Sequence, residues 1–474
     1  MTITRKPQRK ALKSRAKNRS SANKSAKSES DLFPIVGVGA SAGGLESFTR
    51  LIRHLPANTG MAFVLVQHLD PEHESKLPQL LAKSSNMPVL EVANNTRVKP
   101  NHIYVIPPNR SMTINDRVLK LLPRKQALRP YRSIDYFFES LANDQRNQAI
   151  GVILSGTATD GTLGLQAIKG EGGITFAQDE SAKYESMPKS AIAAGDVDFV
   201  LPPEKIAEEI ARIAEHPFAT EEQKKKVSDE AEAGGIVDEG NELQEILLLV
   251  RNHSRVDFSL YRGNTIRRRI MRRMVLAQIK ELSEYADYLR HNPVELEALY
   301  QDLLIAVTGF FRNPETFEEL KKKVFPKLLK GRSPDDEMRV WVIGCSTGQE
   351  AYSIAMAFLE YSSGVSQNIR LQVFATDLND ALLEKARAGL YPKSLVQDVS
   401  RERLRRFFVE EDGGYRISKT VREMCIFARQ NIIADPPFSR MDLISCRNLL
   451  IYLEPELQRK VIPTFHYALK PEGF

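Results

Sequence analysis

A short apolar segment that ends in a glycine-flanked serine constrains the fold of this chain most strongly. Residues 34–45 read PIVGVGASAGGL, and residues 39–43 fit the pattern G-x-S-x-G. This pattern is typical of a sharp turn from a strand into a helix, which raises a serine oxygen above the carboxyl end of a parallel sheet. The N–H groups at the start of that helix would face developing negative charge. A glycine-rich turn of a nucleotide-binding fold is the alternative, although the glycine spacing misses G-x-G-x-x-G by one residue.

Strands and helices alternate along residues 32–215. Short apolar runs predict strands, and apolar residues at helical spacing predict helices. The expected strands are 61–66, 103–106, 118–122 and 149–154, and the expected helices are 44–55, 70–85 and 133–145. This alternation favours a doubly wound parallel sheet, in which reactive groups gather beyond the carboxyl ends of the strands.

Three residues that could act together each follow the end of an expected strand: Ser41, His68 and Asp160. A nucleophilic serine needs an imidazole to take its proton, and the imidazole needs a carboxylate to fix its tautomer. The chain order Ser, His, Asp differs from that of common α/β-hydrolases, so their fold is not implied. The alternatives are an ordinary loop histidine at position 68 and a turn or helix cap at Asp160.

Several motifs of this first unit resemble the catalytic domain of the chemotaxis protein-glutamate methylesterase family. They are GASAGG at 39–44, QH at 67–68, ILSGTATDG at 153–161, and QDE followed by SMP within 178–188. The resemblance implies Ser41 as the nucleophile, His68 as general base and acid, and Asp160 as the orienting carboxylate. The family usually has Gly-Met-Gly where this chain has GTA at 156–158, in a loop expected to lend a backbone N–H to the oxyanion hole. Alanine there could shift that donor if the backbone needs a positive φ.

The charge of the chain is unevenly distributed. Residues 1–30 hold ten Lys or Arg against the single acid Glu29, whereas the rest of the chain is slightly acidic. We expect residues 1–31 to be a disordered basic tail, and we expect a linker at 216–240. No nucleic-acid partner is expected, because the folded part is slightly acidic. No apolar run approaches the roughly 18 residues of a membrane span, so no membrane insertion is expected.

The three cysteines show neither disulfide nor metal-ligand spacing. This usage predicts a reducing cytoplasm and no metal site.

Residues 241–315 are expected to form a helical subdomain. Within it, TIRRRIMRRM at 265–274 places Ile266, Ile270, Met271 and Met274 on one face and five arginines elsewhere. A solvated helix face is the usual interpretation of such a charge run. The alternative is a docking face for an acidic helical partner.

A second α/β pattern begins with an expected strand at 338–343, the loop GCSTG at 344–348 and a helix at 349–359. The next expected strand, 371–376, ends in Asp377. This layout is typical of folds that hold an adenosine cofactor: a glycine-rich turn follows the first strand, and an acid ends the second. The carboxylate of that acid binds the ribose hydroxyls of the cofactor. This layout alone does not distinguish a nicotinamide from a methyl donor, and the loop lacks the Walker sequence.

Longer motifs in the second half resemble the chemotaxis receptor methyltransferase family. They are VTGFFR at 307–312, WVIGCSTGQEAYSIA at 341–355, ATDL at 375–378 and DLISCRNLLIY at 442–452. The resemblance implies that S-adenosylmethionine contacts Thr308, Arg312, Glu350, Asp377, Asn431, Ile432, Arg447 and Asn448. It also implies that Tyr452 and Arg312 face the acceptor carboxylate. Ala306 stands where the family often has an asparagine near the cofactor.

We therefore expect an α/β protein with two doubly wound parallel-sheet domains and a small all-α subdomain between them. The expected methylesterase domain spans 32–215 and the expected methyltransferase domain spans 316–474, where the sheet looks incomplete at its C-terminus. The predicted function is hydrolysis of protein glutamate methyl esters and S-adenosylmethionine-dependent methylation of receptor glutamates. Its predicted partner is a methyl-accepting receptor or another acidic helical signalling protein. A signalling scaffold with one or both sites degenerate is the alternative, motivated by Ala158, Ala306 and the absence of a receiver domain.

Overall fold

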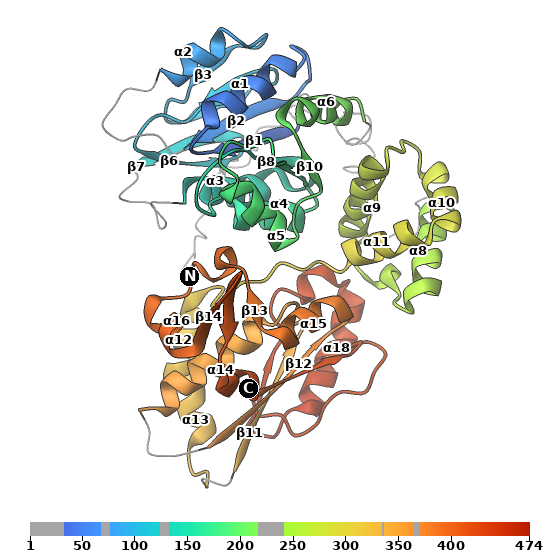
Figure 1. The fold of residues 1–474 in the computed structure, drawn as a ribbon. Coiled ribbons are helices and arrows are strands. Elements are labelled where there is room, and N and C mark those ends of the chain that lie inside the picture. Colours follow the sequence, from blue (N-terminus) through green and yellow to red (C-terminus); the bar gives the residue numbers. More distant parts are fainter. Residues whose placement is uncertain (1–32, 68–75, 124–131, 217–240, 334–335, 365–368) are drawn as a thin grey trace, which may run out of the picture. The chain divides into compact units, whose positions relative to one another are not determined.

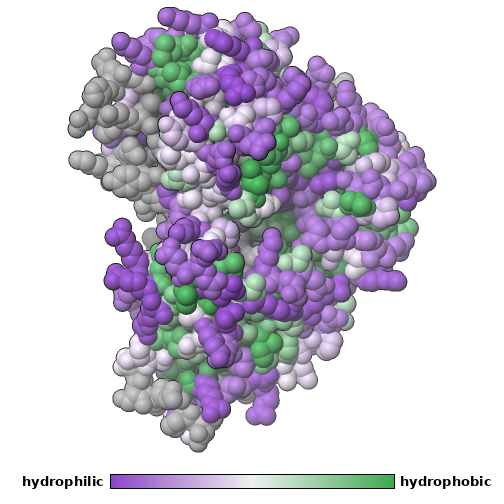
Figure 2. Space-filling model, in the orientation of Figure 1, coloured by the Kyte–Doolittle hydropathy of each residue, from purple (hydrophilic) through white to green (hydrophobic). Residues whose placement is uncertain are grey.

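The computed structural model describes residues 33–67, 76–123, 132–216, 241–333, 336–364 and 369–474. The expected basic tail, the expected linker and His68 lie outside these ranges. Figure 2 shows hydrophilic side chains over most of the visible face and hydrophobic residues in smaller groups. Within the described ranges, no helix combines the length and the apolar character that crossing a lipid bilayer requires.

The first sheet is entirely parallel and has seven strands in the order β10-β9-β8-β1-β2-β5-β3. Its strands are β1 Ile35–Ala40, β2 Ala62–Gln67, β3 Val89–Glu91, β5 Ile103–Val105, β8 Ala149–Ile153, β9 Ile174–Gln178 and β10 Phe199–Leu201. Both faces of a parallel sheet are covered by helices, and all residues of β1, β8 and β9 are accordingly buried. A small antiparallel sheet is formed by β4 Thr96–Arg97, β6 Arg110–Asn115 and β7 Val118–Pro123.

Helices pack on both faces of this sheet (Figure 1). One apolar core lies between the sheet and three helices, namely α1 Gly44–His54, α2 Leu77–Ala82 and α6 Pro203–Ala214. A second core lies between the sheet and three other helices, namely α3 Ser133–Gln145, α4 Thr162–Gly170 and α5 Ser186–Ala194. Gly39 allows α3 to approach β1 closely, because a Cβ at Gly39 would lie 2.5 Å from Cγ2 of Ile134. The doubly wound sheet that the sequence predicts is therefore confirmed.

Residues 241–304 contain four helices, α8 Asn241–Ser254, α9 Gly263–Ala277, α10 Leu282–His291 and α11 Pro293–Leu303, with a 3₁₀ turn at Phe258–Leu260. The apolar face predicted for α9 is buried, but the prediction of a solvated arginine face is wrong for two arginines. Arg269 is 4% exposed and Arg272 is fully buried. Arg272 forms ion pairs with Asp198 and Asp302, which compensate the desolvation of its guanidinium.

The second sheet is parallel and has the order β16-β12-β11-β17. Its strands are β11 Glu337–Ile343, β12 Arg370–Asp377, β16 Cys425–Arg429 and β17 Leu443–Ser445. The helices are α12 Pro314–Glu319, α13 Phe325–Leu329, α14 Gln349–Ser362, α15 Asp380–Ala388, α16 Arg401–Phe407, α17 Lys419–Arg422 and α18 Pro455–Ala468. A small antiparallel sheet of β13 Leu390–Tyr391, β14 Phe408–Glu411 and β15 Gly414–Ile417 is inserted between α15 and α17.

The two faces of this second sheet are covered by different helices. Residues of α14 belong to the apolar core on one face, whereas Trp341 of β11 packs edge-on against Phe465 of α18 on the other face. Figure 1 shows α14 and α18 flanking β11 and β12. The described residues therefore contain two α/β sheets, and helices α8 to α11 lie between them in sequence, where an all-α subdomain is predicted.

Candidate active sites

Three neighbouring strands of the first sheet lead to the residues predicted to form a hydrolase site. Ser41 follows β1, Asp160 lies in the loop after β8, and His68 is the residue after β2. The order β8-β1-β2 places these strand ends side by side, and the register pairs Ala40 with Gln67. Ser41 and Asp160 therefore project from the same edge of the sheet, while His68 lies outside the described residues.

Backbone and side-chain hydrogen bonds hold the turn at Ser41. Its N–H donates to the carbonyl of Ser155 at 3.0 Å, and its own carbonyl accepts the N–H of Gly44 at 2.9 Å. The Gln67 amide also donates to this carbonyl at 3.3 Å. The N-cap of α1, Gly43, has a φ of +76°. Helix α1 therefore begins at Gly44, three residues beyond the serine, as the G-x-S-x-G pattern predicts.

The loop after β8 needs a positive φ at the position where the sequence has alanine. Ala158 has a φ of +68°, a left-handed conformation that glycine adopts without strain. The same loop passes close to the serine, because a Cβ at Gly156 would lie 3.1 Å from Cβ of Ser41. The backbone of this loop thus keeps the left-handed turn despite the alanine, at a conformational cost of about 1–2 kcal/mol.

Asp160 caps α3, and Asp135 of α3 in turn caps α4, which begins two residues after Asp160. The two carboxylate oxygens of Asp160 accept the N–H groups of Ile134 and Asp135, both at 2.9 Å, in the first turn of α3. Asp135 accepts the N–H of Gly164, in the first turn of α4, at 2.7 Å. Arg132 donates to the other oxygen of Asp135 from Nε at 3.0 Å and from Nη2 at 2.8 Å. The carboxylate predicted to orient a histidine is therefore fixed by a helix N-terminus.

This pair places two buried carboxyl groups near each other. Asp135 is fully buried and Asp160 is 4% exposed. Burial, together with the charge of Asp160, raises the pKa of Asp135, and Arg132 opposes this effect. Sequence reasoning missed Asp135, because an acid in the first turn of a helix ordinarily indicates only a favourable interaction with the helix dipole.

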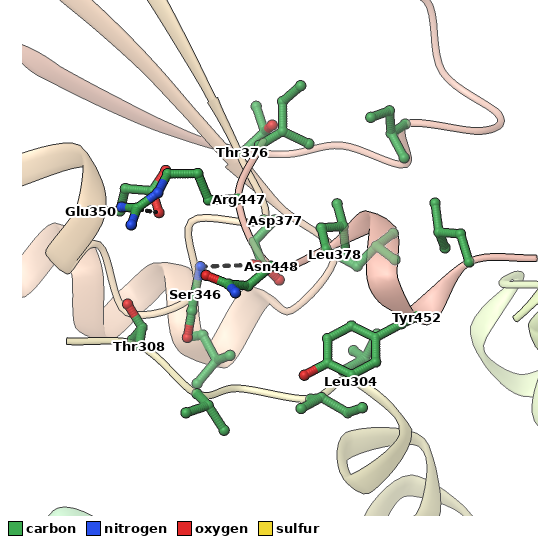
Figure 3. A pocket seen from close by; sticks show the side chains of 18 of the residues that line it. Leu304, Thr308, Ser346, Glu350, Thr376, Asp377, Leu378, Arg447, Asn448 and Tyr452 are labelled. Atoms are coloured by element: carbon green, nitrogen blue, oxygen red, sulfur yellow. Dashed lines mark hydrogen bonds and ion pairs between the residues drawn. The ribbon is translucent and has the colours of Figure 1, made fainter. Parts of the chain in front are cut away.

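The second sheet has a cavity at the carboxyl ends of β11 and β12 (Figure 3). Eight predicted residues line it, namely Thr308, Arg312, Glu350, Asp377, Ile432, Arg447, Asn448 and Tyr452. Asn431 is not among the lining residues. Its side-chain oxygen accepts the N–H groups of Ile433 and Ala434, so it caps its own turn instead. The sequence motifs, which are distant along the chain, thus converge on one site.

Asp377 is held by backbone donors at the end of β12. Its carboxylate oxygens accept the N–H of Ser346 at 2.8 Å and that of Asn379 at 3.0 Å. Burial raises the pKa of Asp377, and these N–H groups oppose that rise. Ser346 belongs to the turn between β11 and α14. This is the arrangement of acid and turn that binds the ribose of an adenosine cofactor.

Glu350 is the second carboxylate in the cavity. Ser445 donates to it at 2.6 Å, and Arg447 forms an ion pair with it at 3.5 Å. Burial raises the pKa of Glu350, while Ser445 and Arg447 lower it. Arg447 also donates to the carbonyl of Arg312 at 2.6 Å. Figure 3 shows Glu350 and Arg447 on one side of the cavity and Tyr452 with Leu304 on another.

The helical segment contributes residues to this cavity that sequence reasoning missed. These residues are Tyr261, Thr265, Ile266, Leu303 and Leu304. They lie just before or within the first turn of α9 and at the C-terminal end of α11, where the periodicity indicated only a buried helix face. No local sequence signal distinguishes an apolar residue that lines a cavity from one that packs in a core.

Comparison with known proteins identifies both parts of the chain. The CheB methylesterase family model matches residues 36–210. Two CheR methyltransferase models match, that of the all-alpha domain at 241–304 and that of the SAM binding domain at 306–474. The cofactor of the second sheet is therefore S-adenosylmethionine, and the acid and the turn that line the cavity fit its adenosine.

Relatives resemble each half separately or both halves together. An uncharacterised 104.1 kDa protein of Rhodobacter capsulatus is 36% identical over 84% of this chain, which spans 43% of that protein. A chemotaxis protein methyltransferase of Listeria monocytogenes is 31% identical over 48% of this chain and 84% of its own length. A protein-glutamate methylesterase/protein-glutamine glutaminase of Burkholderia pseudomallei is 37% identical over 39% of this chain and 54% of its own length. The chain therefore belongs to the CheR family of chemotaxis protein methyltransferases, and the same polypeptide carries a CheB methylesterase domain ahead of the methyltransferase.

Proposed function

We propose that this chain sets the methylation level of glutamate side chains on a methyl-accepting receptor. Residues 241–474 would add methyl esters and residues 33–216 would remove them. One observation supports the proposal: each family match covers a sheet edge at which predicted reactive residues lie, Ser41 and Asp160 in the first sheet and Asp377 and Glu350 in the second. The combination in one chain supports two opposed reactions on one class of substrate.

In the proposed hydrolysis, Ser41 attacks the ester carbonyl and releases methanol, leaving an acyl-enzyme that water then hydrolyses. His68 takes the serine proton and returns it to the leaving methoxide, and Asp160 orients the histidine. The loop at 156–158 is proposed to supply backbone donors to the oxyanion. This assignment is supported by the proximity of Gly156 to Ser41.

In the proposed methyl transfer, the cofactor supplies an electrophilic methyl group when it is bound. A glutamate acceptor is already anionic at neutral pH, so no general base is required and positioning should supply most of the rate. Asp377 would bind the adenosine part, Thr308, Glu350, Ile432, Arg447 and Asn448 would complete the site, and Tyr452 with Arg312 would face the acceptor carboxylate. We assign Asn431 no side-chain contact, because it does not line the cavity and its side-chain oxygen accepts hydrogen bonds within its own turn.

We propose a cytoplasmic location for this chemistry. All three cysteines are free thiols in the structure, as is usual for proteins of a reducing compartment.

The proposal is tested with S-adenosylmethionine carrying a labelled methyl group and with receptor membranes. The parent chain should transfer label to the receptor and then release it as methanol. The variant Ser41→Ala should methylate the receptor at the parent rate and release no methanol. Continued release from this variant would contradict the serine assignment, and failure to label any receptor would contradict the methyltransferase assignment.

A further inference from the structure

Tyr261 connects the helical segment to the cofactor cavity. The backbone around it is joined to the segment that carries Tyr452 by an antiparallel bridge between Tyr261 and Leu453. The N–H of Arg262 donates to the carbonyl of Tyr452 at 2.9 Å, and the N–H of Glu454 donates to the carbonyl of Leu260 at 3.2 Å. The position of Tyr261 beside the cavity is therefore fixed on both sides.

The ring of Tyr261 is packed, but its hydroxyl has no intrachain partner among the described residues. The residue is 8% exposed, and its ring lies 5.0 Å from the ring of Phe258. Tyr261 lines the cavity, and no hydrogen bond of its hydroxyl is found within the described ranges. A tyrosine hydroxyl that is mostly buried usually has a hydrogen-bond partner. The cavity is thus the place where this partner would bind.

The charge of Asp377 reaches this hydroxyl. Burial raises the pKa of Tyr261 to about 12, and the carboxylate of Asp377 adds to the rise. The phenol is consequently protonated at neutral pH and available as a donor. The carboxylate of Asp377 can only accept hydrogen bonds, whereas the phenol would donate one, so the two groups would complement each other on a ligand that carries hydroxyls.

We propose that Tyr261 is a cofactor-binding residue, whose hydroxyl donates a hydrogen bond to the part of S-adenosylmethionine that Asp377 binds. The cofactor then contacts the helical segment and the sheet at once, so that binding holds the two together. This inference rests on the assignment of S-adenosylmethionine to the cavity.

The test compares Tyr261→Phe with Tyr285→Phe in the full chain. Each variant removes one hydroxyl and keeps the ring, and both residues belong to the helical segment. Tyr285 donates to Glu295 at 2.8 Å, so its hydroxyl has a protein partner. Calorimetry would give the Kd of S-adenosylmethionine and of S-adenosylhomocysteine, and thermal unfolding without ligand would give the stability of each variant.

We expect Tyr261→Phe to raise both Kd values about 3- to 10-fold, as one lost hydrogen bond predicts, without lowering the unfolding temperature of the ligand-free chain. Tyr285→Phe should lower that temperature and leave Kd unchanged. Parent-like binding by Tyr261→Phe would overturn the inference, as would a loss of ligand-free stability equal to that of Tyr285→Phe. If the parent chain itself bound neither ligand, the cofactor assignment would fail, an outcome distinct from failure of the Tyr261 contact alone.

Discussion

The left-handed alanine in the loop after β8 gives a quantitative prediction for Ala158→Gly. With a φ of +68°, Ala158 carries strain that glycine would relieve, about 1–2 kcal/mol. Glycine also increases the conformational entropy of the unfolded chain, and this effect offsets about 0.4–1 kcal/mol of the gain in stability from the relieved strain. The free energy of unfolding should therefore rise by about 0.5–1 kcal/mol, and Tm of a domain of this size by about 1–4 °C.

The measurement must report on the first sheet alone, because a chain with two sheets need not unfold in one step. Hydrogen exchange of amides in β1 and β8 provides such a readout. The control is Ala193→Gly, an exposed alanine in the regular helix α5. There, glycine removes no strain and should lower stability by about 1 kcal/mol.

The same variant also tests the proposal that the loop at 156–158 supplies backbone donors to the oxyanion. Because Ala158 already has the left-handed conformation, we expect methanol release by Ala158→Gly to stay within about twofold of the parent rate. A gain of about 10²-fold or more would mean that alanine displaces a donor, since that is the usual effect of one oxyanion contact. A loss of stability equal to that of Ala193→Gly would refute the strain argument.

Three further substitutions have defined outcomes. Asp377→Ala should weaken S-adenosylmethionine binding at least about tenfold in calorimetry, because it removes a half-buried acceptor that lines the cavity. Asp380→Ala, on the exposed start of α15, is the control. Gly39→Ala should destabilise the first sheet by about 1–3 kcal/mol in denaturant unfolding, because the added Cβ would meet Ile134; a neutral result would show that α3 can move away. The raised pKa of Asp135 means that the folded state binds its proton more tightly than the unfolded state, so this carboxyl group's contribution to stability falls as the pH rises from about 4 toward neutrality. Asp135→Asn should therefore gain stability relative to the parent as the pH rises from about 4 to about 7, and a constant difference would contradict the shift.

The sequence predicts helices and strands well where the periodicity of hydrophobic residues distinguishes the two. Helix α3 has the predicted bounds, Ser133–Gln145, and β12 ends at Asp377 as expected. Periodicity is a local property, and it places an acid or a serine at a strand end without reference to the rest of the chain. The place of Ser41 and Asp160 at the same edge of the sheet then follows from the strand order β8-β1-β2.

Contacts between distant segments could not be predicted in this way. The burial of Arg272 depends on Asp198 and Asp302, neither of which lies near it in sequence. The contact of Asp135 with Gly164 joins two helices, and the place of Tyr261 in the cavity depends on a bridge to Leu453. Each of these features arises from a contact between segments that only the tertiary fold brings together, so the sequence around each residue does not reveal it.

The capping of α3 by Asp160 affects the choice of a substitution that abolishes hydrolysis. It also affects how an inactive esterase domain can be recognised from its sequence. Removing the Asp160 carboxylate would leave two N–H groups of α3 without an acceptor, so a change there would disturb architecture as well as chemistry. Ser41 is the better position for a clean knockout. A lineage that had lost hydrolysis would still have a structural reason to keep the aspartate, and its presence in a homologous sequence is therefore no proof of activity.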